Sequence, residues 1–341
     1  MTQGARILIL ADAGAKVGGG HIMRCLTLAE ALTRAGAECA FVAGPAAWAV
    51  LDAFAQAPVE VFPLDEEASA SELAAAGVRV ARTWSASGLV ADHYGFGPGD
   101  DATLSGACER LLIIDDLRRR HAYGLVLDSN IGRKPADYPG REVLAGPQFA
   151  LVRPAFAALR TGTLARRAAG GPPRRVLVSL GLTDAGAITG RVVRALVPAL
   201  GEAHLDVVVG GAAPSRPELE ALARADSRVA VHVDARDMAE RIAAADIGGG
   251  AGGSSAWERC CLGLPSLTVI VADNQRENTT ALAREGATLA IAPPSGDFDA
   301  RLGAAFARLI SDATLRTSMS GAAAALCNGL GADRVAKRLL A

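Results

Sequence analysis

Residues 6–34 read RILILADAGAKVGGGHIMRCLTLAEALTR, and this stretch decides the fold of the first half of the chain. It begins with a short apolar run at 6–10 and passes through a glycine-rich turn into a segment with helical periodicity at about 21–34. Apolar residues recur in that segment at spacings of three and four: Ile22, Cys25, Leu26, Ala29 and Leu32. A strand, a tight turn and a helix with one buried stripe predict the first unit of a parallel sheet covered by helices.

The alternation of strand and helix continues along the chain and then restarts. In the first half, further apolar runs that predict strands lie at 39–42, 89–91, 111–114 and 125–127. In the second half, the strand-like runs are 176–180, 205–209, 229–233 and 267–271, and the helical segments between them are 192–200, 238–245 and 255–262. The fold class that this order predicts is α/β, with two Rossmann-like domains facing each other across a cleft.

Composition places the boundary between the two predicted domains. Glycine, proline and arginine accumulate between residues 161 and 175, where neither the helical nor the strand period survives. We therefore expect an N-terminal domain at 1–160, a linker at 161–173 and a C-terminal domain at 174–341. Parallel α/β sheets bind ligands at the carboxyl ends of their strands, so the expected site is the cleft between the domains.

Length, charge and cysteine usage exclude several classes of protein. A chain of 341 residues favours two domains, and 35 basic against 36 acidic side chains leave a formal net charge of -1. No overall field attracts nucleic acid or an anionic membrane, so a phosphate ligand must be held locally. The first apolar run is too short to span a membrane and no signal-peptide cleavage pattern follows it, which predicts a cytoplasmic protein. The six cysteines lack paired spacing, so we expect buried thiols, no metal site and no cofactor.

The first chemical motif, GGGH at residues 18–21, joins the first strand to the first helix. Glycines let the backbone approach a ligand, and the helix that begins at His21 points unpaired N–H groups outward. An imidazole at this end of a helix is disfavoured as the cation, so His21 is our candidate for a neutral general base. The alternative is a surface histidine without a chemical role. Asp12 ends the first strand, where it could contact substrate, orient His21 or simply form a turn.

The second motif is GGGAGGSSAWE at residues 248–258. Its glycines offer backbone donors, Ser254 and Ser255 add hydroxyls at a helix start, and Glu258 follows about one turn later. We expect the N–H groups from Gly252 to Ser254 to hold a diphosphate and Glu258 to bind ribose hydroxyls. The alternative is a tight strand-to-helix turn with a solvated glutamate.

Two weaker groups also follow predicted strands of the second half. Gly181 and Thr183, in the segment SLGLTD, would add donors for phosphate, or else mark only the end of a strand. Asn274 and Gln275, in the segment ADNQ, could read sugar hydroxyls and acetamido groups, or else belong to an ordinary cap of the next helix.

The strands of the first half end in polar residues as well. The segments are DHYG at 92–95 and IDD at 114–116, and both put polar groups toward the expected site. Adjacent residues of a strand point to opposite faces, so we do not expect Asp115 and Asp116 to share a proton.

In order along residues 18–275, the segments GGGHIMRCLTLAEAL, VADHYG, IIDDL, GPQFALVRP, SLGLTD, GAGGSSAWERCCLGLPSL and VADNQ resemble one family. It comprises the UDP-2,4-diacetamido-2,4,6-trideoxy-β-L-altropyranose hydrolases of pseudaminic acid biosynthesis, which are related in fold to the glycosyltransferase MurG. The resemblance implies a GT-B fold, a catalytic His21, a uridine-holding Glu258, and Tyr94 near the sugar. It also implies a role in flagellin or surface-glycan modification. The chain departs from the family at Leu182, where a second glycine is common.

These observations predict a hydrolase in which His21 activates water for inverting attack on the anomeric carbon of a UDP-sugar. We expect a monomer whose partners are this substrate and water, without nucleic acid or membrane. The predicted substrate-binding residues are Asp12, Gly20, Arg24, Tyr94, Gly181, Thr183, Gly252, Gly253, Ser254, Ser255, Glu258, Asn274 and Gln275. The alternatives are a UDP-sugar-dependent GT-B glycosyltransferase, a 2-epimerase and a non-catalytic sensor. An epimerase would need carboxylates placed for proton abstraction at carbon two of the sugar, and we identify no such set. A sensor would need no general base such as His21.

Overall fold

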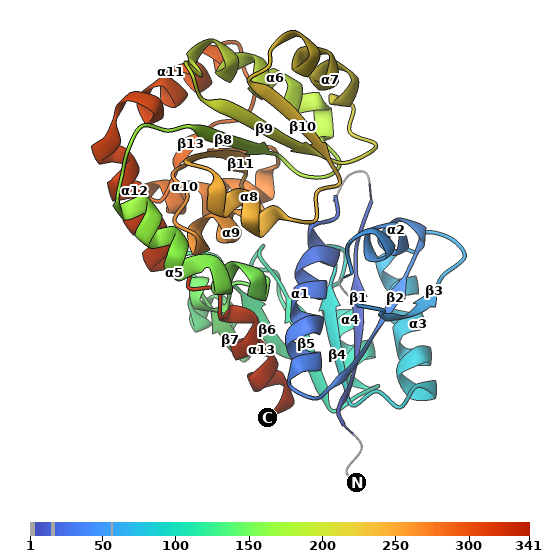
Figure 1. Cartoon of the computed structure of the whole chain (residues 1–341). Coiled ribbons are helices and arrows are strands. Elements are labelled where there is room, and N and C mark those ends of the chain that lie inside the picture. The colour runs from blue at the N-terminus through green and yellow to red at the C-terminus, as the bar shows by residue number, and fades with distance from the viewer. Residues whose placement is uncertain (1–3, 15–17, 56) are drawn as a thin grey trace. The chain divides into compact units, whose positions relative to one another are not determined.

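The computed structural model describes residues 4–14, 18–55 and 57–341, which form two compact units (Figure 1). Unit 1 contains Met1–Leu151 together with Leu330–Ala341, and unit 2 contains Val152–Gly329. Each unit is built on one parallel sheet, so the predicted α/β class with two Rossmann-like domains is confirmed.

The sheet of unit 1 has seven strands in the order β3-β2-β1-β4-β5-β6-β7. They are β1 (Arg6–Ala11), β2 (Glu38–Ala43), β3 (Glu60–Pro63), β4 (Gly88–Asp92), β5 (Arg110–Ile114), β6 (Leu125–Asp128) and β7 (Glu142–Ala145). The helices are α1 (Gly20–Arg34), α2 (Pro45–Phe54), α3 (Ala70–Thr83), α4 (Pro98–Ser105) and α13 (Gly331–Leu340). The last helix, red in Figure 1, packs along α1 although it lies at the other end of the chain.

Strand β1 shows why this sheet needs helices on both faces. Ile7 and Ile9 belong to a core with α1, α2 and α13, while Leu8 and Leu10 belong to a second core with α3 and α4. All of these β1 side chains are fully buried, which accounts for a continuous rather than alternating apolar run. Burial of each such side chain stabilises the fold by roughly 1.5–3 kcal/mol.

The sheet of unit 2 has six strands in the order β10-β9-β8-β11-β12-β13. They are β8 (Arg175–Ser179), β9 (His204–Val209), β10 (Val229–Val233), β11 (Ile247–Ala251), β12 (Ser266–Val269) and β13 (Leu289–Ile291). The helices are α5 (Pro154–Ala168), α6 (Ile188–Leu196), α7 (Arg216–Ala225), α8 (Met238–Ala244), α9 (Ser255–Cys261), α10 (Arg276–Arg284), α11 (Phe298–Ser311) and α12 (Ala313–Leu326).

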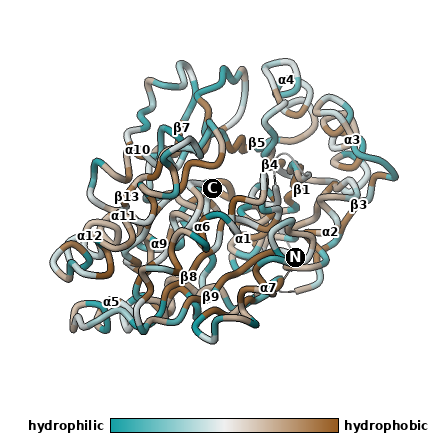
Figure 2. Tube along the Cα trace, turned by 90° about the horizontal axis from the view of Figure 1, so that it is seen from above, coloured by the Kyte–Doolittle hydropathy of each residue, from teal (hydrophilic) through white to brown (hydrophobic). Residues whose placement is uncertain are grey.

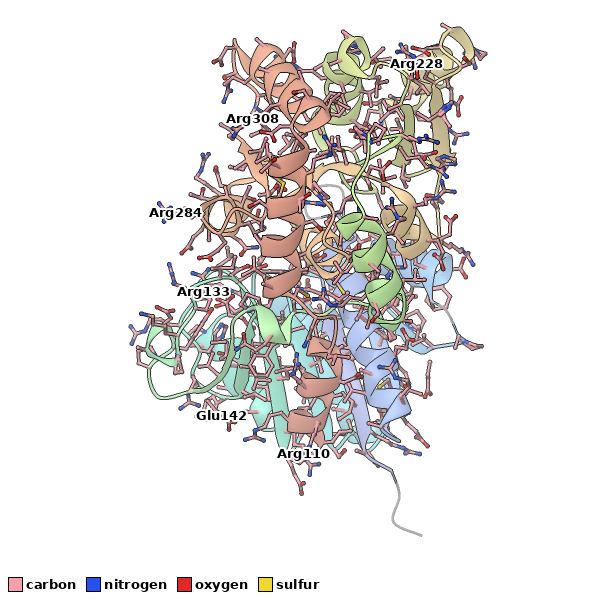
Figure 3. The ribbon with its side chains drawn as sticks, turned by 60° about the vertical axis from the view of Figure 1, so that its left-hand side comes forward. Arg110, Arg133, Glu142, Arg228, Arg284 and Arg308 are labelled. Carbon is pink, nitrogen blue, oxygen red and sulfur yellow. The ribbon has the colours of Figure 1, made fainter. Side chains whose placement is uncertain are left out.

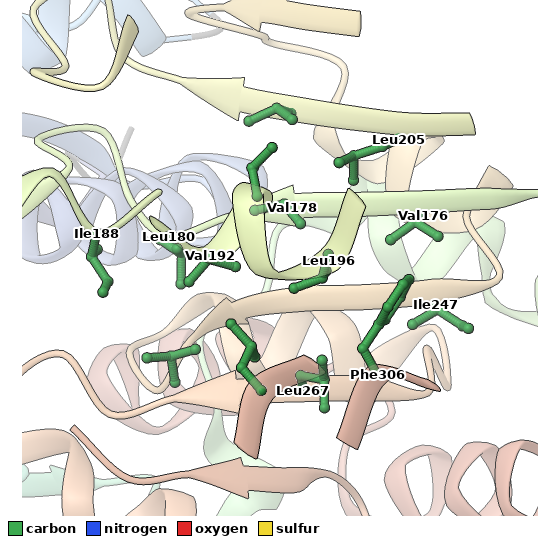
Figure 4. Close-up of a cluster of buried hydrophobic side chains, with 14 of the residues drawn as sticks. Val176, Val178, Leu180, Ile188, Val192, Leu196, Leu205, Ile247, Leu267 and Phe306 are labelled. Carbon is green, nitrogen blue, oxygen red and sulfur yellow. The ribbon is translucent and has the colours of Figure 1, made fainter. Parts of the chain in front are cut away.

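The core of unit 2 joins its central strands to helices α6 and α11. Val176 and Val178 of β8 pack with Leu196 of α6 and Phe306 of α11 (Figure 4). Along the chain trace, β8 and β9 are mostly hydrophobic (Figure 2). Charged side chains such as Arg284 and Arg308 are exposed and project outward from their helices (Figure 3).

The two sheets repeat one strand order, and this places the sites. In each unit the first strand lies between the second strand and the fourth, which is the order of a doubly wound sheet. The order reverses between β1 and β4 in unit 1 and between β8 and β11 in unit 2. Ligands of such sheets bind at the carboxyl ends of the strands beside this reversal, called the switch point below.

The division of the chain differs from the predicted boundary at 161–173. Helix α5 runs through residues 161–168, and Arg166 and Arg167 dock it on unit 2 by donating to the backbone carbonyls of residues 242, 243, 245 and 262. The C-terminal α13 packs in unit 1 rather than unit 2. The short strands β3 and β7, which are only partly buried, escaped prediction.

The predicted strand at 267–271 ends at Val269, and the predicted helix at 192–200 is displaced to α6. The short helical turn Val197–Ala199 follows α6. No helix among the described residues has the length and apolarity needed to cross a membrane.

Candidate functional site

The first candidate site lies at the switch point of unit 1. His21 is the second residue of α1, directly after the glycine-rich loop that follows β1. Asp92 is the last residue of β4 and is paired in register with Ala11 at the end of β1. Because parallel neighbours end at the same edge of the sheet, the strand order brings His21 and Asp92 together across 71 positions of sequence.

His21 and Asp92 form a buried pair. The His21 Nδ1 lies 2.5 Å from the Asp92 Oδ1, and the two residues are 4% and 0% exposed. An ionised carboxylate only accepts hydrogen bonds, so Nδ1 carries the hydrogen and donates it. In the neutral imidazole, Nε2 is then the nitrogen that can take up a proton. The geometry is that of a general base oriented by a carboxylate.

Arg24 keeps Asp92 ionised. Its Nε and Nη2 donate to the two Asp92 oxygens at 2.6 and 2.5 Å, and its Nη1 donates to the Asp116 Oδ2 at 3.0 Å. Burial alone would raise the pKa of Asp92, but Arg24 and His21 lower it by more, so its pKa lies well below the usual range. The structure thus places Arg24, which we predicted to bind substrate, against two carboxylates of its own unit.

Tyr94 packs on the histidine. The two rings meet edge to face with centroids 4.5 Å apart, and the Tyr94 hydroxyl donates to the Asp116 Oδ2 at 3.1 Å. Arg119 fixes the loop that carries Tyr94, because its Nη1 donates to the carbonyls of residues 93, 94 and 96 at 2.8–2.9 Å. Sequence reasoning missed Arg119, although its position shortly after a strand end was a usable signal.

Asp12 and Gly20 border the same edge of the sheet. The Asp12 carboxylate lies 3.6 Å from the His93 Nε2, so Asp92 and not Asp12 is the residue that orients His21. This corrects one of the roles considered for Asp12. Burial lowers the pKa of His93. Among the described residues, no atom lies within 4 Å of a Cβ added at Gly20, so their packing does not explain this glycine.

Asp115 and Asp116 have different partners, as expected for adjacent strand residues. Asp116 bonds to Arg24 and Tyr94, whereas Asp115 accepts from Arg119 and lies 3.1 Å from the His121 Nε2. The other ring nitrogen of His121 lies 3.1 Å from Asp101. Burial lowers the pKa of His121, but hydrogen bonds to Asp101 and Asp115 raise it to about 9. His121 and Arg119, both cationic, thus fix the Asp115 carboxylate, and Arg119 also holds the loop that carries Tyr94.

The second candidate site lies at the switch point of unit 2. Gly252, Gly253 and Ser254 follow β11, and Ser255 begins α9. The Gly252 N–H, however, donates to the Gln275 Oε1 at 3.0 Å. This corrects the prediction that it holds diphosphate. A Cβ at Gly252 would lie 2.1 Å from the Thr279 Oγ1, so close packing against α10 requires this glycine.

The preceding glycines are also structural. Gly248, Gly249 and Gly250 lie within β11 rather than in a turn, which corrects the predicted extent of the loop. A Cβ at Gly248 would lie 2.6 Å from the Leu264 Cδ2, and one at Gly250 would lie 2.3 Å from the Arg259 Nη1. These glycines therefore leave room for the side chains of Leu264 and Arg259, which pack closely against the strand.

Glu258 stands one turn into α9 and is paired. Its Oε1 accepts from the Arg153 Nη2 at 3.1 Å and Nε at 3.3 Å, and both side chains are 17% exposed. Arg153 directly precedes α5. The segment GPQFALVRP contains this arginine, but nothing in its spacing pointed to Glu258.

The remaining predicted residues of unit 2 follow strands that neighbour β11. Gly181 and Thr183 are exposed in the loop after β8, and Gly181 has a φ of 110°. Asn274 and Gln275 lie in a short helical turn at Asp273–Gln275, after β12. The strand order β8-β11-β12 puts the three loops at one edge of the sheet. Asp184 is buried and accepts from the N–H groups of residues 189 and 215, so it shapes the loop.

Comparison with known proteins places the fold. No family model matches the chain. The chain is 27% identical over 195 residues to the spore coat polysaccharide biosynthesis protein SpsG of Bacillus subtilis, covering 57% of this chain and 56% of that protein. It is 27% identical over 157 residues to the UDP-2,4-diacetamido-2,4,6-trideoxy-β-L-altropyranose hydrolase of Campylobacter jejuni, covering 44% and 53%. The chain thus spans about half the length of the curated relatives it matches.

Solved structures match nearly the whole chain. Acinetobacter baumannii MurG has a TM-score of 0.66 at 17% identity, covering 98% of this chain and 99% of that one. The spinosyn rhamnosyltransferase SpnG in complex with thymidine diphosphate has a TM-score of 0.63 at 18% identity, covering 98% and 99%. These likenesses confirm the GT-B fold of two Rossmann-like halves. Among the described residues, no group of three or more His, Cys, Asp or Glu side chains is arranged to hold a metal ion.

Proposed function

We propose that the chain hydrolyses UDP-2,4-diacetamido-2,4,6-trideoxy-β-L-altropyranose to UDP and 2,4-diacetamido-2,4,6-trideoxy-L-altrose. The observation that carries the proposal is the buried His21–Asp92 pair at a switch point, with Nε2 left to accept a proton. The Campylobacter jejuni relative, a hydrolase of this substrate, supports the choice of sugar.

In the proposed reaction, His21 acts as general base and water as nucleophile. The Nε2 of His21 takes a proton from a water molecule. The oxygen of that water forms a bond to the anomeric carbon from the face opposite the diphosphate. The bond from that carbon to the diphosphate oxygen breaks, the electron pair leaves with UDP, and the anomeric configuration inverts. Asp92 stabilises the imidazolium that forms, as a carboxylate does in a catalytic triad. Proton transfer by a positioned side chain contributes about 10²–10⁴-fold to such a rate.

We assign the nucleotide to the residues of unit 2. Glu258 would accept from ribose hydroxyls through the carboxylate that Arg153 orients. The loop from Gly253 to Ser255, with Gly181 and Thr183, would donate to the diphosphate. Asn274 and Gln275 are the amides offered to neutral polar groups of the substrate. Donors aimed at the departing diphosphate stabilise charge that grows in the transition state.

A UDP-sugar-dependent glycosyltransferase is the second candidate. It is favoured by the GT-B fold shared with MurG and by the relative named for polysaccharide biosynthesis. A transferase needs a hydroxyl acceptor in place of water, so its turnover without acceptor would be negligible. We favour the hydrolase because the Campylobacter jejuni relative is named as a hydrolase of such a UDP-sugar.

The test measures UDP release by the purified protein from UDP-2,4-diacetamido-2,4,6-trideoxy-β-L-altropyranose and, in parallel, from UDP-GlcNAc. We propose a cytoplasmic monomer that acts without a metal ion, so EDTA is present. Acceptor is absent, so that UDP release reports hydrolysis and not transfer. Rapid release from the first substrate alone is expected. His21→Ala should remove most of this turnover while UDP binding persists, and an active alanine variant would end the assignment of His21. Tight UDP binding without release from either substrate would favour the transferase.

A further inference from the structure

Arg259 of α9 is buried among uncharged partners. The residue is 6% exposed. Its Nη2 donates to the Ala251 carbonyl at 2.9 Å and to the Thr268 Oγ1 at 3.2 Å, and its Nη1 donates to the Ser255 Oγ at 3.2 Å. Within residues 4–14, 18–55 and 57–341, no carboxylate pairs with this guanidinium. Glu258 acts on it only from a distance and is itself paired with Arg153.

A buried cation without a counter-ion is costly, and burial lowers the pKa of Arg259 accordingly. Other arginines of unit 2 also bond to carbonyls, and for Arg160 and Arg167 those carbonyls end helices. Arg160 bonds to residues 261, 324 and 327, and Arg167 bonds to residues 242, 245 and 262. Cations are favoured there by the helix dipole. Arg259 instead contacts the first residue of α9, the end at which the dipole favours anions.

The strand beside Arg259 is shaped to admit it. A Cβ at Gly250 would lie 2.3 Å from the Arg259 Nη1 and 2.7 Å from its Cζ, and 3.2 Å from the Ser179 carbonyl oxygen. Gly250 and Ser179 are paired in register near the carboxyl ends of β11 and β8. The guanidinium therefore lies at the switch point of unit 2, where a ligand of this sheet is expected.

Ser255 connects this cation to the surface of the site. Its hydroxyl oxygen accepts from Arg259, so its hydrogen can be donated elsewhere. Ser255 is partly exposed, at the start of α9 and next to the loop assigned to the diphosphate. A hydroxyl polarised by a guanidinium is a stronger donor to a phosphate oxygen than an isolated one.

We propose that Arg259 is a positioning residue for the diphosphate of the nucleotide, acting through Ser255 and supplying the positive charge that the bound dianion neutralises. The inference rests on the proposed function, because it takes a nucleoside diphosphate as the ligand of unit 2. The inference predicts a selective effect: loss of the Arg259 charge weakens binding of the nucleoside diphosphate and leaves binding of the nucleoside unchanged.

The test is calorimetric titration of the full chain with UDP and, separately, uridine. For Arg259→Met we expect UDP affinity to fall about tenfold or more, since a charge-assisted hydrogen bond is lost, while uridine affinity stays within twofold. Arg259→Lys, which keeps the charge, should retain UDP affinity within about threefold. Ser255→Ala should weaken UDP and spare uridine. The matched control is Arg167→Met, which removes a partly buried, carbonyl-bonded arginine away from the switch point and should leave both affinities within twofold.

Each outcome separates the inference from the proposed function. Wild-type protein that binds neither ligand overturns the proposed function and this inference with it. If wild type binds UDP and a folded Arg259→Met protein binds it equally well, or loses UDP and uridine alike, only the role of Arg259 is overturned. Circular dichroism and Tm establish folding. If Arg259→Met does not fold, unchanged UDP affinity in Ser255→Ala overturns the inference.

Discussion

Asp92→Asn is the substitution that tests most directly how the unit 1 site works. It preserves the shape of the side chain and removes its charge. This carboxylate contacts the His21 Nδ1 at 2.5 Å, the Arg24 Nη2 and Nε at 2.5 and 2.6 Å, and the Cys25 Sγ at 3.5 Å. Because Arg24 donates to both oxygens, the amide NH2 of asparagine meets an Arg24 donor at either position, and at the position of Oδ1 it also donates to the His21 Nδ1. The neutral imidazole would then carry its hydrogen on Nε2, the nitrogen that must accept a proton.

The magnitude follows from the two effects of the change. The wrong tautomer in a catalytic triad costs about 10⁴ in kcat, and we expect a loss of that order. Leaving Arg24 buried with only Asp116 should also destabilise the protein, by about 3–5 kcal/mol as for other broken buried pairs. The affinity for UDP should not change, because unit 2 supplies the residues assigned to the nucleotide.

The assay combines kcat for UDP release, Tm and the UDP dissociation constant. The matched control is Asp116→Asn, which removes one contact to Arg24 and one to Tyr94 but leaves the His21–Asp92 pair in place. Its kcat should fall no more than about tenfold. An Asp92→Asn enzyme that keeps kcat within tenfold of wild type would refute the claim that Asp92 sets the tautomer of His21.

Two further predictions concern the stability of unit 1. The pKa of His121 is raised to about 9 by Asp101 and Asp115, so its contribution to stability is complete below the unfolded value of about 6.5 and is lost as the pH rises through 9. The Tm difference between wild type and His121→Gln should therefore shrink between pH 6.5 and 9.5, and a constant difference would contradict the assignment. Gly77→Ala would place a Cβ 2.3 Å from the fully buried Leu10 Cδ2 and should cost about 1–3 kcal/mol by urea unfolding. Leu10→Val in the same chain should recover part of that loss, and no recovery would mean that the clash is not its cause.

Much of the fold could be predicted because its signals are local. The buried runs of β1, β4 and β5 are largely continuous and apolar, and turn residues bound them. The domain division could not be predicted, because it depends on tertiary contacts. Residues 161–168 read as a linker through their glycine and arginines, yet Arg166 and Arg167 find carbonyls on α8 and α9 that no local pattern reveals.

The sequence predicted several residues of the candidate sites but not which of them contact one another. Position after a strand end selected His21, Tyr94 and Glu258, since that edge is where a parallel sheet binds ligands. Which carboxylate reaches His21 depends on strand order, and only the adjacency of β1 and β4 favours Asp92 over Asp12. The glycines of 248–250 misled for a related reason: a sequence shows that space is left beside the backbone, but not whether a ligand or Arg259 fills it.

The arginines at the two candidate sites differ in their charged partners. In unit 1, Arg24 is paired with two carboxylates, Asp92 and Asp116. Those carboxylates suit an anomeric carbon that gains positive charge as its bond to the leaving group breaks. In unit 2, Arg259 has no such partner among the described residues, and a dianion would supply one. This difference in charge supports the proposed assignment of the diphosphate to the loop before α9.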